Sequence, residues 1–254
     1  MGDSLGDRMK SQYENRTRMY LPRRTNTIIR LDGKAFHTFT RGFKKPFDQD
    51  LMHLMDHTAK SLCENIQGVK MAYVQSDEIS LLLTDYDNTK TDAWFDGNIQ
   101  KITSVSASLA TSAFNKEYLL KLRGKGSTPI DPKDIQFAHF DSRVFTIPDP
   151  EEVVNYFIWR QQDWTRNSIQ LVGHANFSHK ELHGLSCNKI QAKLLLEKNI
   201  NWNDYSVAEK RGRCIEKKGT GIMLTTYPPQ RQTHWVVMGN IPSFPVTISR
   251  RVSG

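Results

Sequence analysis

The stretch VKMAYVQSDEISLLL, residues 69–83, decides the fold of this chain. Two runs rich in apolar residues, 69–75 and 79–83, flank the polar tip Ser76-Asp77-Glu78, and such a pattern predicts a β-hairpin. The second run ends in three consecutive leucines, which is typical of a strand at the centre of a sheet. The other elements can therefore be arranged around a central hairpin.

The elements on either side of this hairpin alternate between strand and helix. Apolar residues recur at helical spacing over 48–67, with Asp48 as the expected N-cap and Gly68 as the stop. In chain order we expect a strand at 27–31 that breaks at Asp32-Gly33, a helix at 48–67, the hairpin, a helix at 97–115, a basic loop at 121–134 and a strand at 135–147. The resulting βαββαβ order is that of the ferredoxin-like sheet.

The C-terminal half has a different pattern. We expect helices at 151–171 and 188–197, a polar segment at 173–187 between them, and a hairpin formed by 219–227 and 234–239 around Pro228-Pro229. The predicted fold class is α+β, a ferredoxin-like palm (βαββαβ) with an added helical and hairpin half. No flexible linker separates a catalytic region at 1–150 from the region at 151–254, so this boundary is soft and one integrated domain is an open alternative.

Length and composition restrict the class of protein. The chain has 254 residues, of which 38% are hydrophobic, enough for a substantial core. No stretch approaches the ~20 apolar residues that span a bilayer, and the N-terminus lacks an apolar signal segment. We therefore expect a cytoplasmic protein without a membrane partner. The three cysteines are far apart and contain no CxxC pair, which argues against a disulfide framework or a zinc knuckle.

The charge pattern indicates an anionic partner. The net charge is +8 and the pI is near 9.3. Basic residues gather in separate clusters with interspersed aromatic side chains, which suits an extended polyanion better than one small ligand. The clusters lie at 16–24, 41–45, 116–125, 210–218 and 250–251. Ordinary solvated faces account for some of them.

The predicted topology brings carboxylates together. In a βαββαβ sheet the first and third strands are antiparallel neighbours, so the end of one lies beside the start of the other. Asp32 ends the first strand, and Asp77 and Glu78 open the third. Carboxylates this close repel each other unless a cation neutralises them, and hard oxygen ligands select Mg²⁺. Two Mg²⁺ ions ~4 Å apart can serve both oxygens of a phosphoryl displacement, with the Gly33 carbonyl as an extra ligand.

Basic residues follow Asp32 at positions suited to phosphate. Arg41, Lys44 and Lys45 can hold phosphate oxygens. His37 lies in the turn after Asp32-Gly33, where backbone N–H groups can cradle phosphate. The carboxylates and these groups together favour nucleotide chemistry.

Other candidate sites are weaker. His53 and His57 have i, i+4 spacing, but a solvated helix face explains them better than a metal site. The irregular spacing of His174, His179 and His183 indicates an interacting loop rather than a zinc site. Neither GxSxG nor a Walker-type GxxxxGK[ST] occurs, so serine hydrolysis and P-loop chemistry lack their usual anchors.

An ordered set of motifs resembles the tRNA-His guanylyltransferase superfamily. The motifs are Arg30–Phe39, Lys45-Pro46, Ser76–Glu78, Phe140–Arg143, Trp159–Gln161 with Asp163, and Lys218–Thr220. The resemblance extends from about residue 12 to residue 225. It implies a fold similar to polymerase palms and an enzyme that adds nucleotides in the 3′–5′ direction to the 5′ end of the tRNA acceptor stem.

The resemblance also implies a reaction and an assembly. ATP adenylylates the 5′-monophosphate of the RNA, the 3′-hydroxyl of an incoming NTP such as GTP attacks that end, and pyrophosphate is then removed. Two Mg²⁺ ions are the implied cofactors. The implied assembly is a homotetramer.

Site residues follow from the matching motifs. Asp32, the Gly33 carbonyl and Asp77 would hold the metals, and Asp32, Asp77 and Glu78 would be catalytic. The expected nucleotide contacts are Lys34, Ala35, Phe36, His37, Lys45, Ser76, Glu78, Lys101 and Arg143. The expected RNA contacts are Arg123, Lys125, Arg160, Arg166 and Asn167.

One segment departs from the eukaryotic members that add a single G to tRNA-His. Their His-Ile-Asn-Asn-Leu-Tyr-Asn motif corresponds to Thr165-Arg-Asn-Ser-Ile-Gln-Leu171, in which only Asn167 is retained. We therefore expect the guanylyltransferase-like branch, which repairs 5′-truncated tRNAs against a template. The metal site would be shared family chemistry, and substrate choice would depend on other parts of the chain.

Three other functions remain as alternatives. The first is a dedicated tRNA-His guanylyltransferase, which uses the same chemistry. The second is a non-catalytic RNA-binding protein, which the basic clusters alone would allow. The third is a palm-type nucleotide cyclase, which the basic clusters and the long helical second half disfavour.

Overall fold

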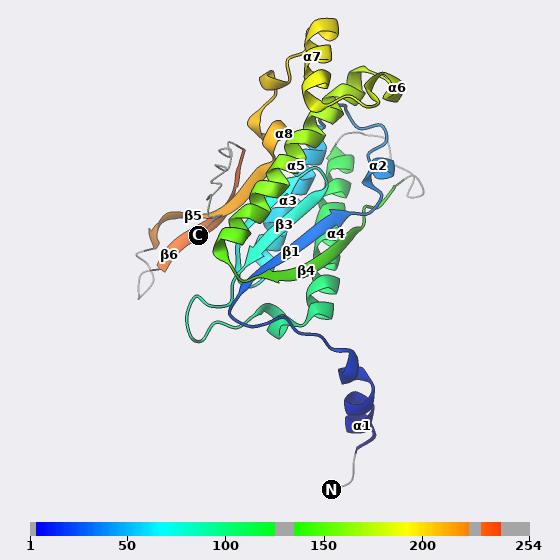
Figure 1. The fold of residues 1–254 in the computed structure, drawn as a ribbon. Coiled ribbons are helices and arrows are strands. Elements are labelled where there is room, and N and C mark those ends of the chain that lie inside the picture. The colour runs from blue at the N-terminus through cyan, green and yellow to red at the C-terminus, as the bar shows by residue number, and fades with distance from the viewer. Residues whose placement is uncertain (1–3, 125–134, 224–229, 240–254) are drawn as a thin grey trace, which may run out of the picture.

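Six strands form one antiparallel sheet in the order β4-β1-β3-β2-β5-β6 (Figure 1). The structure is a computed structural model that describes residues 4–124, 135–223 and 230–239. The strands are β1 Asn26–Gly33, β2 Val69–Gln75, β3 Glu78–Leu83, β4 Phe140–Ile147, β5 Arg213–Met223 and β6 Gln230–Met238. The order of the first four strands confirms the predicted ferredoxin-like sheet.

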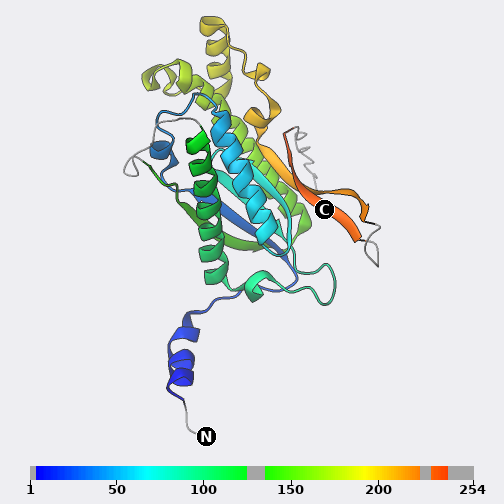
Figure 2. The ribbon, with the colours of Figure 1, turned by 180° about the vertical axis from the view of Figure 1, so that it is seen from behind.

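Helices cover both faces of this sheet. They are α1 Leu5–Gln12, α2 Phe36–Phe39, α3 Gln49–Asn65, α4 Ile99–Gly124, α5 Pro150–Asn176, α6 His179–Leu182, α7 Cys187–Lys198 and α8 Val207–Arg211. Short 3-10 turns lie at Glu14–Thr17, Trp94–Gly97 and Trp202–Asp204. Figure 2 shows α3 and α4 side by side on one face, and Figure 1 shows α5 crossing the other.

Strand β1 lies between β4 and β3, is buried on both faces, and its side chains alternate between two clusters. Ile29 and Leu31 belong to the main core beneath α3 and α4. Ile28 belongs to a second cluster with Tyr73 and Phe157, on the side of α5. Arg30 and Asp32 share that second face by the alternation of a strand. The alternation of side chains along β1 therefore places Arg30 and Asp32 on the face covered by α5.

Helix boundaries follow local capping chemistry. The Asp48 side chain accepts a hydrogen bond from the N–H of Leu51, so the predicted N-cap of α3 is confirmed. Asp149 caps α5 by accepting from the N–H of Glu151, and Pro150 occupies the first turn, where its missing N–H costs nothing. The Pro148-Asp-Pro150 sequence thus ends β4 and starts α5.

Several predicted boundaries were wrong. Helix α4 continues to Gly124, nine residues past its predicted end at 115, and takes in the start of the expected loop at 121–134. Helix α5 extends to Asn176 and α6 follows, so much of the expected polar segment is helical. Strand β5 begins at Arg213 instead of 219. Pro228-Pro229 lie outside the described residues.

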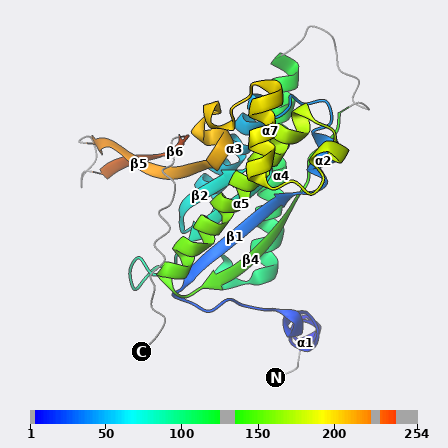
Figure 3. The ribbon, with the colours of Figure 1, turned by 45° about the horizontal axis from the view of Figure 1, so that its top comes forward.

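The C-terminal half joins the same sheet. Strand β5 pairs with β2, so hydrogen bonding continues from the first 150 residues into the second region. The end of α5 packs with α6, α7 and Trp202 around a third apolar cluster. In Figure 3, α7 and the end of α5 lie at one end of the sheet, near α2, while α1 projects from the opposite end. In the described part of the chain, no helix has the length and apolar character to cross a membrane.

Candidate functional site

The turn between β2 and β3 lies beside the end of β1, as the topology predicts. Asp32 is the register partner of Glu78, and the N–H of Gly33 donates to the carbonyl of Asp77 at 3.1 Å. Two cavities adjoin this point, of about 430 and about 360 Å³, and both are lined by Asp32 and Asp77. Volumes of this size suit a nucleotide-sized ligand.

The larger cavity contains most of the residues expected to hold a nucleotide. Its lining includes Gly33, Ala35, Phe36, His37, Lys45 and Ser76. Apolar side chains such as Trp164 and Leu171 line it as well. The cavity thus combines a carboxylate and lysine end with aromatic walls, an arrangement that suits both the phosphates and the base of a nucleotide.

Asp77 has unusual electrostatics. Burial is the main cause that raises its pKa to about 6; a hydrogen bond from Ser76 opposes the shift, and the nearby Asp32 contributes to it. A carboxylate in this setting is stabilised by a cation. In the described residues no group of three or more His, Cys, Asp and Glu side chains is arranged to hold a metal ion by itself. Mg²⁺ fits two carboxylates and a main-chain carbonyl, because it commonly keeps waters and substrate phosphates as its other ligands.

Gly33 is required by packing. A Cβ at this position would lie 2.2 Å from Cδ2 of Phe36, so any other residue would displace the ring. That ring is buried against Phe39, Phe114 and Phe140. The glycine therefore lets α2 fold tightly over the end of β1, which keeps the backbone after Asp32 close to the carboxylates.

The backbone after Asp32 offers fewer free donors than expected. The N–H of Lys34 donates to the carbonyl of His139 at 2.8 Å, so it is already used. The N–H groups of Phe36 and His37 open α2, where a helix leaves its first donors without intrahelical partners. The phosphate cradle predicted for this segment therefore begins after Lys34, whose side chain is exposed.

The loop that carries Lys45 is anchored at Asp48. One carboxylate oxygen of Asp48 caps α3, and the other accepts from the N–H of Lys44 at 2.9 Å. Phe47 packs edge-on against Trp164 and Tyr205, which belong to the C-terminal half. These contacts hold Lys44 and Lys45 at the cavity wall.

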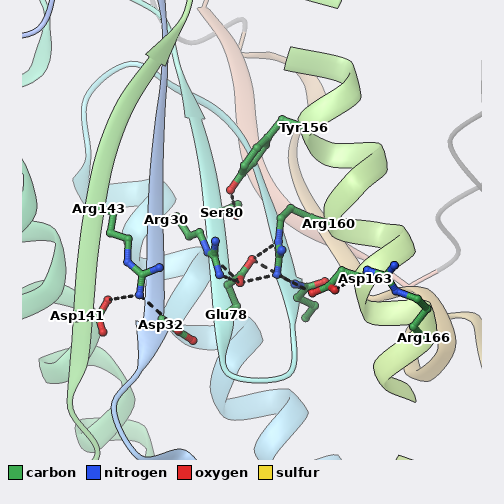
Figure 4. Close-up of polar contacts among 11 residues, drawn as sticks. Arg30, Asp32, Glu78, Ser80, Asp141, Arg143, Tyr156, Arg160, Asp163 and Arg166 are labelled. Carbon is green, nitrogen blue, oxygen red and sulfur yellow. Dashed lines mark hydrogen bonds and ion pairs between the residues drawn. The ribbon is translucent and has the colours of Figure 1, made fainter. Parts of the chain in front are cut away.

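Glu78 lies at the site, but its carboxylate is already bound by arginines (Figure 4). Arg160 donates to its Oε1 at 2.8 Å and to its Oε2 at 2.7 Å, and Arg30 donates to Oε2 at 3.0 Å. Burial raises the pKa of Glu78, and the two guanidinium groups oppose that shift. Direct metal or nucleotide contact by Glu78 is thus not what the structure shows. Its carboxylate joins β1, β3 and α5.

Two further residues predicted as contacts lie away from the cavities or are already paired. Lys101 lies near the start of α4, which adjoins Leu21 ahead of β1, at the opposite end of the sheet from Asp32. Its ammonium lies over the ring of Phe95, 5.7 Å from the centroid. Arg160 is 4% exposed and paired with Glu78, so it is not an RNA contact in this structure. Their residue types fitted the expectation, but their positions in the fold do not.

The remaining predicted contacts are distributed around the site. Arg143 approaches Asp32, with its Nη2 3.8 Å from Oδ2. Asn167 lines the smaller cavity, and Arg166 is exposed on α5. Arg123 is exposed at the end of α4, whereas Lys125 lies outside the described residues.

The segment that departs from the eukaryotic motif borders the site. Asn167, Gln170 and Leu171 line the smaller cavity, together with Gln75 and His174. The departure of this segment from the eukaryotic motif was the reason to separate substrate choice from the shared metal site, and in the structure the segment and the carboxylates Asp32 and Asp77 line the same cavity. The helix predicted at 151–171 already contained this segment, and α5 confirms that Trp159 and Leu171 lie on one helix.

The sequence also left some cavity residues unassigned. Trp164, Glu209 and Arg213 line the larger cavity. Asp141 lies opposite Asp32 in the register of β1 and β4. Its position two residues before Arg143 was the available signal, because alternate residues of a strand share a face.

Comparison with known proteins gives a consistent result. Residues 6–148 match the family model described as tRNAHis guanylyltransferase. A probable tRNA(His) guanylyltransferase of Dictyostelium discoideum is 30% identical over 206 residues, which cover 75% of each chain. The tRNA(His) guanylyltransferase of Eremothecium gossypii is 29% identical and covers 77% of this chain and 84% of its own.

Solved structures show the same likeness. A bacterial tRNA(His) guanylyltransferase-like protein in complex with ATP has 48% identity and a TM-score of 0.81, covering 94% of both chains. A second structure of such a protein, in complex with GTP, has 44% identity and a TM-score of 0.76, covering 95% of this chain and 94% of that one. The tRNA(His) guanylyltransferase of Saccharomyces cerevisiae has 26% identity and a TM-score of 0.68, covering 84% and 93%.

Proposed function

The chain belongs to the tRNAHis guanylyltransferase family, and we propose that it is a Mg²⁺-dependent nucleotidyltransferase that adds nucleotides to the 5′ end of tRNA. The observation that carries the proposal is the pair Asp32 and Asp77 at the junction of two nucleotide-sized cavities. Relatives of similar fold have been solved with ATP and with GTP, which supports nucleotides as the substrates here.

The larger cavity supports binding of the activating nucleotide. Lys44 and Lys45 offer positive charge to phosphate oxygens, and the first N–H groups of α2 offer hydrogen bonds. Asp32, Asp77 and the Gly33 carbonyl would hold Mg²⁺, which polarises the phosphoryl group and favours an ionised attacking hydroxyl. The aromatic walls exclude water from the base, so the protein orients the triphosphate toward the carboxylates.

The smaller cavity supports a second nucleotide beside the first. It shares Asp32, Ser76 and Asp77 with the larger cavity. In the proposed reaction the RNA 5′-phosphate is adenylylated by ATP with loss of pyrophosphate. The 3′-hydroxyl of the incoming NTP then attacks that phosphate and AMP leaves. Because the two cavities adjoin at Asp32 and Asp77, both phosphoryl displacements can take place at the same pair of carboxylates.

The curated relatives favour guanylyl addition to tRNA-His as the specific activity, because they are named for it. Template-dependent repair of 5′-truncated tRNAs is the second candidate. One observation favours it: the divergent residues Gln170 and Leu171 line the smaller cavity, where the eukaryotic members carry a different motif. Carboxamides such as Gln170 can donate or accept, so they tolerate different bases.

One assay separates the two specificities. The purified chain is incubated with ATP, NTPs and 5′-monophosphorylated transcripts, either full-length tRNA-His or 5′-truncated tRNAs of several identities. Addition of G to tRNA-His alone supports the dedicated enzyme. Templated addition to every truncated tRNA supports repair. Addition to none of them by the wild-type chain contradicts the proposal and favours a non-catalytic RNA-binding protein. Unchanged addition by Asp32→Ala contradicts the assignment of Asp32 to the catalytic site.

A homotetrameric assembly and a cytoplasmic location also remain proposals. Light scattering coupled to gel filtration tests the first, and cell fractionation tests the second. A stable monomer at micromolar concentration would contradict the tetramer.

A further inference from the structure

Arg143 lies between two carboxylates at the edge of the site (Figure 4). Its Nη2 is 3.8 Å from Oδ2 of Asp32 and donates to Oδ1 of Asp141 at 3.4 Å. Both carboxylates lie at the same level of the sheet, because Asp32 and Asp141 are register partners on β1 and β4. One guanidinium group therefore bridges a candidate metal ligand and a carboxylate that has no other assigned role.

The neighbouring carboxylate Glu78 is not open to Arg143. Arg30 is the register partner of Arg143, and it is bound to Glu78 together with Arg160. Both oxygens of Glu78 are occupied by these two buried or half-buried arginines. Asp32 and Asp141 are thus the carboxylates with which Arg143 pairs in the described structure.

A bound cation would weaken the contact of Arg143 with Asp32 but not its contact with Asp141. A divalent cation at Asp32 would repel the guanidinium, since both carry positive charge and would share one carboxylate. Asp141 would keep its attraction for Arg143. The side chains of Arg143 and Asp141 are 53% and 56% exposed, so packing does not fix either contact. The guanidinium group of Arg143 can therefore move from Asp32 to Asp141 at little cost in energy.

We propose that Asp141 is a positioning residue that holds Arg143 at the site when a metal ion occupies Asp32. In the metal-free chain Arg143 neutralises Asp32. When the cation binds, Arg143 shifts fully to Asp141, and its guanidinium then faces the phosphate oxygens of the substrate. The inference rests on the proposed function, because it takes Asp32 to be a metal ligand.

A double-mutant cycle on metal affinity tests the role of Asp141. The dissociation constant for Mn²⁺ alone is measured by electron paramagnetic resonance for the wild type, Asp141→Asn, Arg143→Gln and the double variant. We expect Arg143→Gln to tighten Mn²⁺ binding, because a competing cation is removed. Asp141→Asn should weaken it about two- to fivefold, because Arg143 then stays on Asp32.

The double variant decides between two roles. If Asp141 acts through Arg143, Asp141→Asn has no further effect once Arg143→Gln is present. If Asp141→Asn weakens Mn²⁺ binding equally in the wild type and in Arg143→Gln, Asp141 acts as a direct ligand or through its overall charge, and the inference is overturned. Asp163→Asn is the matched control, since Asp163 pairs with Arg166 and Arg160 instead, and it should leave the affinity unchanged.

A second measurement does not depend on turnover. With Mn²⁺ present, we expect the wild type to bind a 5′-phosphorylated RNA hairpin more tightly than its 5′-hydroxyl form. Asp141→Asn should reduce this preference, and Arg143→Gln should abolish it. An undiminished preference in Asp141→Asn would overturn the inference. A wild-type chain that binds no Mn²⁺ would instead contradict the proposed function itself.

Discussion

Asp77 shows how a buried carboxylate proposed as a metal ligand can lower stability. Its pKa is raised from 3.8 to about 6 by burial and by Asp32, so the ionised form is disfavoured in the folded, metal-free chain. Below pH 3.8 the carboxyl is protonated in both the folded and unfolded states. Above pH 6 it is ionised in both, and the folded state then carries the full cost.

We therefore predict that Asp77→Asn stabilises the metal-free protein at pH 7.5. The gain should be about 2 kcal/mol after allowance for partial solvent access, or roughly 4–8 °C in Tm. It should fade as the pH falls through 6 toward 4, as measured by thermal unfolding in EDTA. Added Mn²⁺ should raise the Tm of the wild type and leave that of the variant unchanged. A gain independent of pH would contradict this account.

Gly33 is a second residue with a specific cost of substitution. Gly33→Ala places a methyl group 2.2 Å from the Phe36 ring, which is buried among three other aromatic rings. We expect a loss of about 1–3 kcal/mol and weaker ATP binding, because α2 must move away from the carboxylates. Urea unfolding and equilibrium ATP binding measure the two effects. Gly6→Ala, which has open space around it, should change neither.

At the scale of elements, the N-terminus of α3 links helix stability to the Lys45 loop. Asp48 accepts from Leu51 in the helix and from Lys44 in the loop. Asp48→Ala should cost about 1 kcal/mol and raise the KM for ATP, since both contacts are lost. Asp48→Asn keeps a good capping residue and should retain most of the stability. Equal loss in both variants would show that the charge of Asp48, and not the cap, matters.

Strands and helices with clear local signals could be predicted from sequence. Residues 69–75 coincide with β2, and the helix after Asp48 begins where its cap places it. The order of β1 to β4 followed from chain order alone. The end of α4 could not be read in this way, because Asn115 lies inside it and bonds Ala138, 23 residues away. Tertiary contacts extend that helix where its local composition resembles a loop.

The candidate site was predictable only in part, for a similar reason. Topology brought Asp32 and Asp77 together because strand pairing is fixed by the βαββαβ order. The partners of Glu78 could not be read from sequence, since Arg160 reaches it from 82 residues away. Lys101 was assigned from a motif match, without knowledge of which end of α4 faces the carboxylates.

At the scale of the whole molecule, Glu78 and Arg160 join the sheet to α5. Removing one member of a buried pair leaves an uncompensated charge, which typically costs about 3–5 kcal/mol. Arg160→Leu should therefore lower the Tm by roughly 6–20 °C, as measured by differential scanning calorimetry. Arg166→Ala, whose arginine is exposed, should leave the Tm almost unchanged.

The same pair of variants tests which of the two arginines, Arg160 or Arg166, contacts RNA. If Arg166 contacts RNA, Arg166→Ala should reduce the salt dependence of RNA binding by about one unit of slope. Arg160→Leu should leave the slope unchanged at a temperature where it is folded. A lower slope in Arg160→Leu would restore Arg160 as an RNA contact.

Helix α5 contributes to two apolar clusters, and this affects how the protein unfolds. Its first half supplies Val153, Tyr156 and Phe157 to the cluster on the sheet, and its second half supplies Ile169 and Val172 to the cluster near α7. Neither cluster can melt alone without breaking the helix in its middle, next to Arg160. Amide hydrogen exchange along α5 should thus occur through one cooperative opening, with similar protection at both ends of its buried face.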